Sequence, residues 1–199
     1  MEIDRWVREM RQELPLVDVI CNVAERMCRA KGEERRILAG ELQTLLMLDG
    51  DYDNALQILD MMIEDYPDDA GPLSSKASLY FYHLQDPEEA LKWIDLALER
   101  AERTGFFRRQ AFGTKARILL ELGRGDQLSD VLEEIMSLRI VKGIPDIGRE
   151  RDFVDRAPLG LIREDVLARY NEFRPRRSGD TTANEPPKFE PPDDAVWTH

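Results

Sequence analysis

The side chains with the greatest chemical reactivity in this sequence are few and widely separated. There are two histidines and two cysteines, the residue types that most often act as general bases, nucleophiles or metal ligands. His83 and His199 are far apart, whereas Cys21 and Cys28 are separated by seven residues. In a helix this spacing places both thiols on one face two turns apart, too far for a disulfide. We therefore expect two reduced core thiols, a reducing compartment, no metal site and no cofactor.

Other catalytic patterns are equally weak. His83 is the only histidine before the C-terminal tail, and neither a serine in a nucleophile elbow nor a catalytic cysteine motif accompanies it. The segment Gly123-Arg124-Gly125-Asp126 is too short for a phosphate-binding loop and lacks the required lysine. The sequence therefore predicts no catalytic residues and a protein that is not an enzyme.

The overall charge narrows the class of partner. The 199 residues include 28 Lys and Arg against 40 Asp and Glu, which gives a net charge of −12. Nucleic acids and anionic membranes require a basic surface, so neither is an expected partner. The N-terminus lacks the pattern of a signal peptide, and no apolar run approaches the ~18 residues of a membrane helix. We expect a cytoplasmic protein, and its compact size favours a bacterial-type host.

The histidines and cysteines must be positioned by helices, because the apolar side chains recur with helical spacing and never with strand alternation. Pro and Gly mark most of the expected boundaries. The expected fold class is all-α, with about eight or nine helices at about residues 3–14, 15–31, 33–48, 51–65, 72–84, 87–105, 106–122, 126–138 and 161–173.

A repeated motif connects the central helices. Residues 50–69 read Gly-Asp-Tyr-Asp-Asn-Ala-Leu-Gln-Ile-Leu-Asp-Met-Met-Ile-Glu-Asp-Tyr-Pro-Asp-Asp, and Asp86 opens a second copy in which Ala90 stands 35 residues after Ala55. This pattern resembles the second helix of a tetratricopeptide repeat (TPR), whose period is about 34 residues. A degenerate third copy has Ala116 in its first helix and Val131 in place of the small residue. The resemblance implies antiparallel helix pairs stacked as a short right-handed α-solenoid.

The expected organisation has five parts. They are an N-terminal helix pair that is either a divergent repeat or a cap (1–32), a TPR-like repeat core (33–139), an irregular connector (140–160), a C-terminal capping helix (161–175) and an acidic, proline-rich flexible tail (176–199).

The resemblance also implies a binding surface, because the first helix of each TPR pair lines a concave groove. The groove residues it implies here are Thr44, Met47, Lys76, Leu79, Tyr82, His83, Arg109, Thr114 and Arg117. For Met47, Leu79 and Tyr82 the alternative is a place in the core. Basic residues gather in the fifth and seventh helices and acids in the sixth and eighth. This segregation either marks a groove for a ligand with apolar anchors and a carboxylate, or only solvates helix faces.

The tail contains a second candidate motif. Phe189 and Trp197 stand in an acidic strip rich in proline, a composition typical of both disordered segments and linear docking motifs. We expect it either to insert an aromatic side chain into a groove, of its own chain or a neighbour, or to stay free.

The leading functional interpretation is a non-enzymatic TPR adaptor or scaffold that binds a protein or peptide segment. The co-chaperone clamp of some TPR proteins is not expected, because Gly40, Thr44 and Lys76 replace its Lys, Asn and Asn. One alternative is an acidic immunity or antitoxin-type inhibitor that masks a basic protein. The other is a self-assembling structural repeat protein, for example a homodimer.

Overall fold

The computed structural model describes residues 3–104, 108–138 and 153–173, and in these ranges the regular structure is entirely helical. The all-α class predicted from the sequence is therefore confirmed. The helices are α1 (Ile3–Glu13), α2 (Leu16–Arg29), α3 (Gly32–Asp49), α4 (Tyr52–Asp65), α5 (Gly71–Tyr82), α6 (Pro87–Thr104), α7 (Arg108–Glu121), α8 (Gly125–Ser137) and α10 (Glu164–Phe173).

Local chemistry explains where the central helices begin and end. α3 ends at Gly50, whose φ of 82° is a left-handed conformation that glycine adopts without steric cost. The Asp51 carboxylate then accepts a hydrogen bond from the Asn54 backbone amide and caps α4. Asp86 caps α6 in the same way, accepting from the Glu89 backbone amide at 3.0 Å. These caps make each turn within a pair short, so consecutive helices pack antiparallel.

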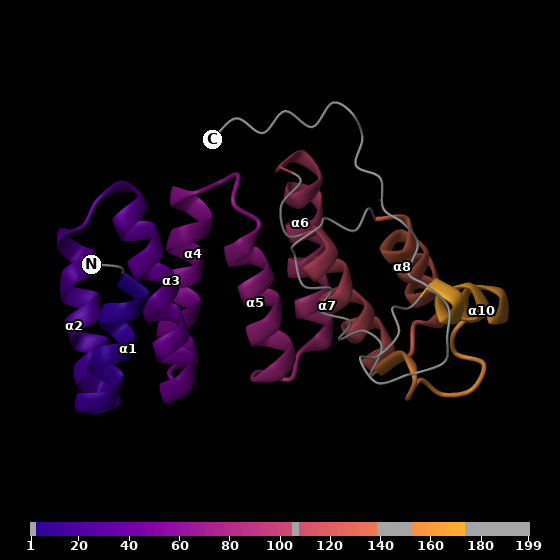
Figure 1. Cartoon of the computed structure of the whole chain (residues 1–199), viewed down its shortest axis with the longest axis horizontal. Helices are drawn as coiled ribbons and strands as arrows, with labels where there is room; N and C mark the ends of the chain where they lie inside the picture. The colour runs from indigo at the N-terminus through magenta and orange to yellow at the C-terminus, as the bar shows by residue number, and fades with distance from the viewer. Residues whose placement is uncertain (1–2, 105–107, 139–152, 174–199) are drawn as a thin grey trace, which may run out of the picture.

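The helices stack as consecutive pairs, α1 with α2, α3 with α4, α5 with α6, and α7 with α8 (Figure 1). The second helix of each pair also packs on the first helix of the next pair. First helices touch one another as well, since α1 contacts α3 and α5 contacts α7. α1 and α2 thus pack as a further pair, although the assignment of residues 1–32 as a repeat or a cap stays a prediction.

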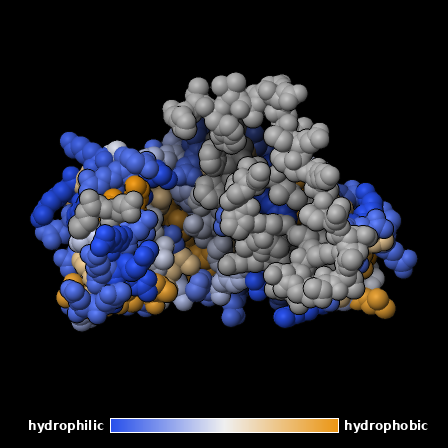
Figure 2. All heavy atoms as spheres, viewed as in Figure 1, coloured by the Kyte–Doolittle hydropathy of each residue, from blue (hydrophilic) through white to orange (hydrophobic). Residues whose placement is uncertain are grey.

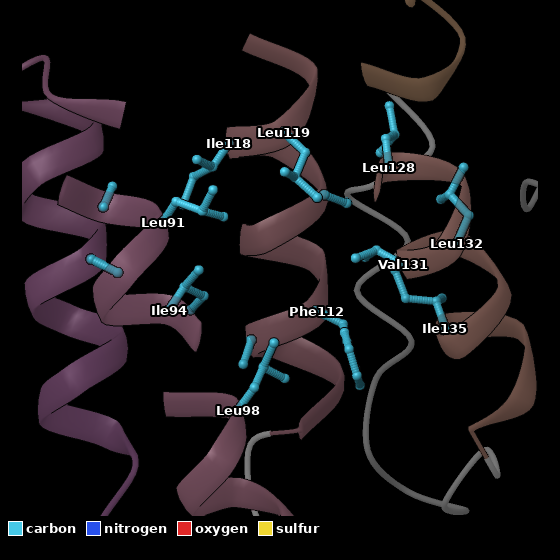
Figure 3. Packing of buried hydrophobic residues seen from close by; sticks show 14 of the residues in the cluster. Leu91, Ile94, Leu98, Phe112, Ile118, Leu119, Leu128, Val131, Leu132 and Ile135 are labelled. Carbon is cyan, nitrogen blue, oxygen red and sulfur yellow. The ribbon is translucent and has the colours of Figure 1, made fainter. Parts of the chain in front are cut away.

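Two adjoining clusters form the core. The N-terminal cluster joins α1 to α4 around Val19, Val23, Leu38 and Leu59, and Leu79 of α5 completes it. The C-terminal cluster joins α5 to α8 and α10, and Figure 3 shows its middle part, where side chains of α6, α7 and α8 interdigitate. The small residues that the repeat pattern places at helix crossings are fully buried, namely Ala55, Ala90, Ala97 and Ala116. Each helix pair contributes one apolar face to a neighbour, so stability comes from stacking.

α10 covers the end of the stack by packing on α8. The buried Ser129 hydroxyl accepts a hydrogen bond from the Arg163 backbone amide at 3.0 Å. At Gly125 an added Cβ would lie 1.9 Å from the Leu161 carbonyl oxygen, so only glycine allows this segment to approach. Arg163 and Arg169 both pair with Glu133 and fix α10 against α8.

The prediction that Cys21 and Cys28 are core thiols is wrong, because both side chains are exposed. The buried face of α2 consists of Val19, Val23 and Met27, and the two cysteines lie together on another face of the same helix. No helix among the described residues is long and apolar enough to cross a bilayer. The same residues contain no group of three or more His, Cys, Asp or Glu side chains arranged to hold a metal ion.

Two sequence predictions lie largely outside the described residues. These are the tail at 176–199, which includes Phe189 and Trp197, and most of the connector at 140–160.

Candidate functional site

The candidate binding surface is the solvent side of the first helices α3, α5 and α7. We call it the first-helix face and define it by Thr44, Ser78, Tyr82, Thr114 and Arg117, all exposed or half-buried. On α5, Ser78 and Tyr82 are one turn apart, and on α7 Thr114 and Arg117 have the same relation. Each helix therefore contributes a short stripe of side chains to the same open surface.

Tyr82 and Arg117 form the clearest contact across this face. The Arg117 guanidinium lies 5.0 Å from the centre of the Tyr82 ring, so the last residue of α5 is joined to α7. Tyr82 also packs edge-on against Phe81, with ring centres 4.9 Å apart. The Tyr82 residue nevertheless remains 48% exposed, and Arg117 is exposed too. The two side chains are held in place while still presenting an aromatic ring and a cation to solvent.

His83 lies beside this pair, immediately after α5. Its Nδ1 is 3.1 Å from the hydroxyl of Tyr52, the first residue of α4, and the two ring centres are 5.0 Å apart. This contact ties the ends of two adjacent helix pairs together. His83 is exposed, so it can meet a ligand as well as support Tyr52.

The remaining polar residues of the face serve their own helices first. The Thr44 hydroxyl donates to the Gly40 carbonyl at 3.0 Å, and the Thr114 hydroxyl donates to the Gln110 carbonyl at 3.2 Å. Met47 is half-buried and its sulfur accepts a hydrogen bond from a Gln43 amide. The two hydroxyl groups are thus engaged within their own helices.

Lys76 does not lie on the open face as predicted. It is only 5% exposed, and its ammonium group pairs with Asp60 of α4 and lies 3.9 Å from the centre of the Trp93 ring of α6. Trp93 is oriented by its indole NH, which donates to Glu89 at 3.0 Å. Lys76 is therefore a buried connector of three helices, because α4 and α6 enclose the side of α5 from which it extends.

Two more predicted groove residues lie elsewhere. Leu79 is 0% exposed and belongs to the N-terminal core cluster, so the core alternative holds for it. Arg109 is half-buried, and its guanidinium extends toward α8, with 3.5 Å between Nη1 and the Ile135 carbonyl oxygen. Arg109 precedes Arg117 by eight residues, which is more than two helical turns. It is therefore rotated away from the stripe that contains Thr114 and Arg117.

The segregation of charge between first and second helices arises mainly from pairing between them. Lys76 pairs with Asp60, Lys115 with Asp95 at 2.7 Å, and Arg108 with both Glu102 and Glu134. Among the described residues, Arg117 forms no ion pair. The predicted attraction of this face for an acidic ligand thus reduces largely to a single guanidinium.

Glu41 shows that α1 covers part of α3. Burial raises the pKa of the Glu41 carboxyl above its ordinary value, and the negative charge of Asp4 on α1 adds to this, while Arg11 opposes it. Both charges come from α1, so the open part of α3 is confined to its C-terminal half around Thr44 and Leu48.

Sequence reasoning missed a cleft on the side of the second helices. It has a volume of about 620 Å³ and lies between α6, α7 and α8, with Leu91, Phe112 and Val131 among its lining residues. The surrounding charges are paired, for example Asp130 with Arg163 at 3.1 Å and Lys115 with Asp95. The lining residues extend from Leu91 to Glu134 in the sequence, so periodicity alone gave no signal for the cleft.

Comparison with known proteins bears on the fold. No protein-family model matches the chain, and no curated protein matches it. A solved structure does, namely the nearly identical TPR-like repeats ascribed to a kinesin light chain of Podosopora anserina. The TM-score is 0.55 at 14% identity, over 85% of this chain and 91% of that chain. The chain has a TPR-like repeat fold. Repeat scaffolds of this kind typically mediate protein interactions, and the low identity carries the likeness no further than the fold.

Proposed function

We propose that this TPR-like protein is a non-enzymatic adaptor that binds a segment of another protein across its first-helix face. The observation that carries the proposal is the Tyr82–Arg117 contact, which holds two exposed side chains of different helix pairs in one arrangement. Tyr and Arg are among the residues that most often dominate binding energy at protein interfaces. Because the two side chains already hold each other, they lose little additional entropy when a ligand binds.

The shape of the face also suits an extended chain. Several residues of the face are small enough to let a backbone come close, namely Thr44 on α3, Ser75 and Ser78 on α5, and Thr114 on α7. The Leu48 residue, 56% exposed at the end of α3, and Tyr82 supply apolar contacts. A ligand with apolar anchors and polar backbone groups fits this combination better than a small molecule, which would require a deeper enclosure.

Two alternative functions remain, an acidic inhibitor and a self-assembling repeat protein. An acidic inhibitor of a basic protein would use the same scaffold, and its prediction of a basic partner is developed in the next subsection. A self-assembling repeat protein or homodimer would place a second copy against the exposed apolar residues. The cytoplasmic and bacterial assignments stay predictions.

The proposal is tested by site-specific photo-crosslinking in cells that produce the full chain. A photoreactive residue at Ser78 or Gln110 of the first-helix face should give a defined covalent adduct whose partner is identified by mass spectrometry. Matched positions on second helices, Gln57 of α4 and Glu99 of α6, are also exposed and serve as controls. Adduct formation from Ser78 should fall about tenfold in a Tyr82→Ala background. Adducts that form only from Gln57 or Glu99 would move the binding surface to the second helices and overturn the proposal.

A further inference from the structure

Three exposed apolar residues recur at a constant interval. Leu14, Leu48 and Tyr82 are 34 residues apart from one another in sequence, and they are 40%, 56% and 48% exposed. Each stands at or next to the last residue of a first helix, α1, α3 or α5. An exposed leucine is unremarkable by itself, but a row at the repeat period places one apolar contact on every helix pair.

The three residues lie along one edge of the stack, which we call the turn edge and define as the turns α1–α2, α3–α4 and α5–α6. In Figure 1 this edge runs along the lower margin, whereas the connections α2–α3 and α4–α5 cross the upper margin. Figure 2 shows hydrophobic surface along the lower margin of the N-terminal half. The row therefore spans three consecutive pairs.

Negative charge gathers on the same side of the molecule. Glu13, Asp49 and Glu121 are the last residues of α1, α3 and α7, and all three are exposed. A carboxylate at a helix C-terminus meets the negative end of the helix dipole, which costs a few tenths of a kcal/mol. None of the three forms an ion pair with another described residue. Helix stability therefore gives no reason for acids at these positions.

Other acids on the turn edge stabilise helix N-termini, unlike Glu13, Asp49 and Glu121. Asp51 and Asp86 cap α4 and α6, and Asp18 and Asp53 lie in the first turns of α2 and α4, where the helix dipole favours them. They still add to the negative potential along the turn edge.

On the opposite edge of the stack, acidic side chains pair with arginines. Arg36 pairs with Glu33 and with Asp69, and its guanidinium lowers the pKa of the Glu33 carboxyl. Arg26 likewise pairs with Glu34 at 2.7 Å. Charges on that edge are largely neutralised within the chain, whereas those on the turn edge are left to solvent or to a partner.

We propose that the turn edge docks a basic segment of a partner protein, with apolar side chains seated at Leu14, Leu48 and Tyr82 and Lys or Arg side chains facing Asp49, Asp53 and Glu13. Charge complementarity selects this occupant. A second copy that presents the same edge would bring like charges together, and the tail after residue 178 carries five acids and one lysine, so both are repelled. The inference rests on the proposed function, because it names the class of segment that the first-helix face receives at its lower margin.

The repeat geometry also sets the spacing of the ligand. Packed first helices such as α1 and α3 lie roughly 10 Å apart, so the apolar contacts at Leu14 and Leu48 should be separated by a similar distance. An extended chain covers that distance in about three residues, and a helix in about seven. The partner segment should then carry an apolar residue at every third position if extended, or every seventh if helical, with basic residues between.

The test uses the full chain and labelled 12-residue peptides with Leu at every third position and Lys or Arg between, read by fluorescence anisotropy at 0.15 M salt. A peptide with Ser for Leu, and one with Glu for the basic residues, are the ligand controls. On the protein, Asp49→Lys plus Asp53→Lys should weaken binding of the basic peptide at least tenfold. Glu64→Lys plus Asp68→Lys, exposed acids near the opposite edge, changes net charge equally and should weaken it less than threefold.

The apolar row has its own matched pair. Leu48→Ser should weaken binding of the basic peptide about tenfold, while Leu96→Ser, on α6 and 44% exposed, should leave it unchanged. Circular dichroism checks that all variants fold.

Several outcomes overturn the inference. Equal losses in the two charge-reversal variants would show that net charge alone attracts the peptide. Binding that appears only after residues 178–199 are deleted would assign the edge to the tail. A dimer in light scattering that Leu48→Ser abolishes would assign it to a second copy. If the basic peptide fails to bind while crosslinks from Ser78 persist, the basic segment is wrong but the proposed function stands.

Discussion

α5 presents two regions that the sequence did not distinguish, a buried seam and an open face. On the seam, Lys76 lies between α4 and α6, with its ammonium against Asp60 and Trp93. On the face, Tyr82 is nearly half exposed and contacts Arg117 of α7 and its neighbour Phe81. The two regions are six residues apart in sequence, yet one is part of the fold and the other is available to a partner.

The difference arises because neighbouring helices cover most, but not all, of the surface of a first helix. A first helix packs on its partner helix and on the second helix of the preceding pair, so most of its circumference is covered. Lys76 extends into one of these contacts and keeps its charge because Asp60 and the Trp93 ring accompany it. Only the narrow remaining stripe, with Ser78 and Tyr82, stays free for binding. Substitutions on the buried side and on the open side of α5 should therefore have different effects.

The largest effect is expected on the seam, from Lys76→Glu. The new carboxylate would be buried beside Asp60 without a cation, and breaking a buried pair in this way costs about 3–5 kcal/mol of unfolding free energy. Urea denaturation followed by circular dichroism measures the loss. Lys76→Met is the matched control, because it keeps the apolar stem and leaves Asp60, whose side chain is 54% exposed, solvated. If Lys76→Glu is as stable as Lys76→Met, the cation is not held in the seam.

A somewhat smaller loss is expected from Leu79→Ala, on the same buried side of α5. Leu79 is fully buried in the N-terminal cluster, so the truncation should cost about 3 kcal/mol through lost contacts and a cavity. The melting temperature should fall by roughly 6–12 °C for a chain of this size. Leu96→Ala, at an exposed position of α6, is the control and should change it by at most about 2 °C. A small loss for Leu79→Ala would return this residue to the list of groove contacts.

On the open face the expected change in stability is smaller still. Tyr82→Ala and Arg117→Ala should each cost less than about 1 kcal/mol of unfolding free energy, because both side chains are largely solvated. Tyr82→Ala should nevertheless reduce binding of the partner segment about tenfold. Parallel measurements of melting temperature and of peptide anisotropy separate the two effects. A loss of several kcal/mol in stability would show that the face is part of the core.

Much of the fold could be predicted because each helix pair is marked by residues close together in the sequence. The boundaries of α4 and α6 agree with the Gly, Asp and Pro signals to within about one residue, and Ala55 and Ala90 are buried at the crossings where the pattern places them. These features depend on residues within one repeat, so periodicity and capping rules suffice.

The site was harder to predict because exposure depends on helices distant in sequence. Lys76 is covered by Trp93 and Asp60, each about 16 residues away, and no local pattern records such contacts. Cys21 and Cys28 failed for a related reason, since a seven-residue spacing defines a shared face but not whether that face is buried. Arg117 and Tyr82 were predicted from the TPR resemblance, which implies that the first helices line a groove.

The smallest effect, and the one that tests the boundary between seam and face, concerns Glu41. Burial against α1 and the charge of Asp4 raise the pKa of this carboxyl in the folded chain. An acid whose pKa is raised by folding opposes folding when ionised, so its cost is present at neutral pH and is relieved as pH falls through the raised folded-state pKa. Glu41→Gln should therefore raise the melting temperature slightly at pH 7, and the gain over the parent chain should shrink toward pH 4.5. Thr44→Gln, one turn further along α3 and exposed, should show no such pH dependence. If the two variants behave alike, α1 does not cover this part of α3, and the first-helix face extends over the whole length of α3.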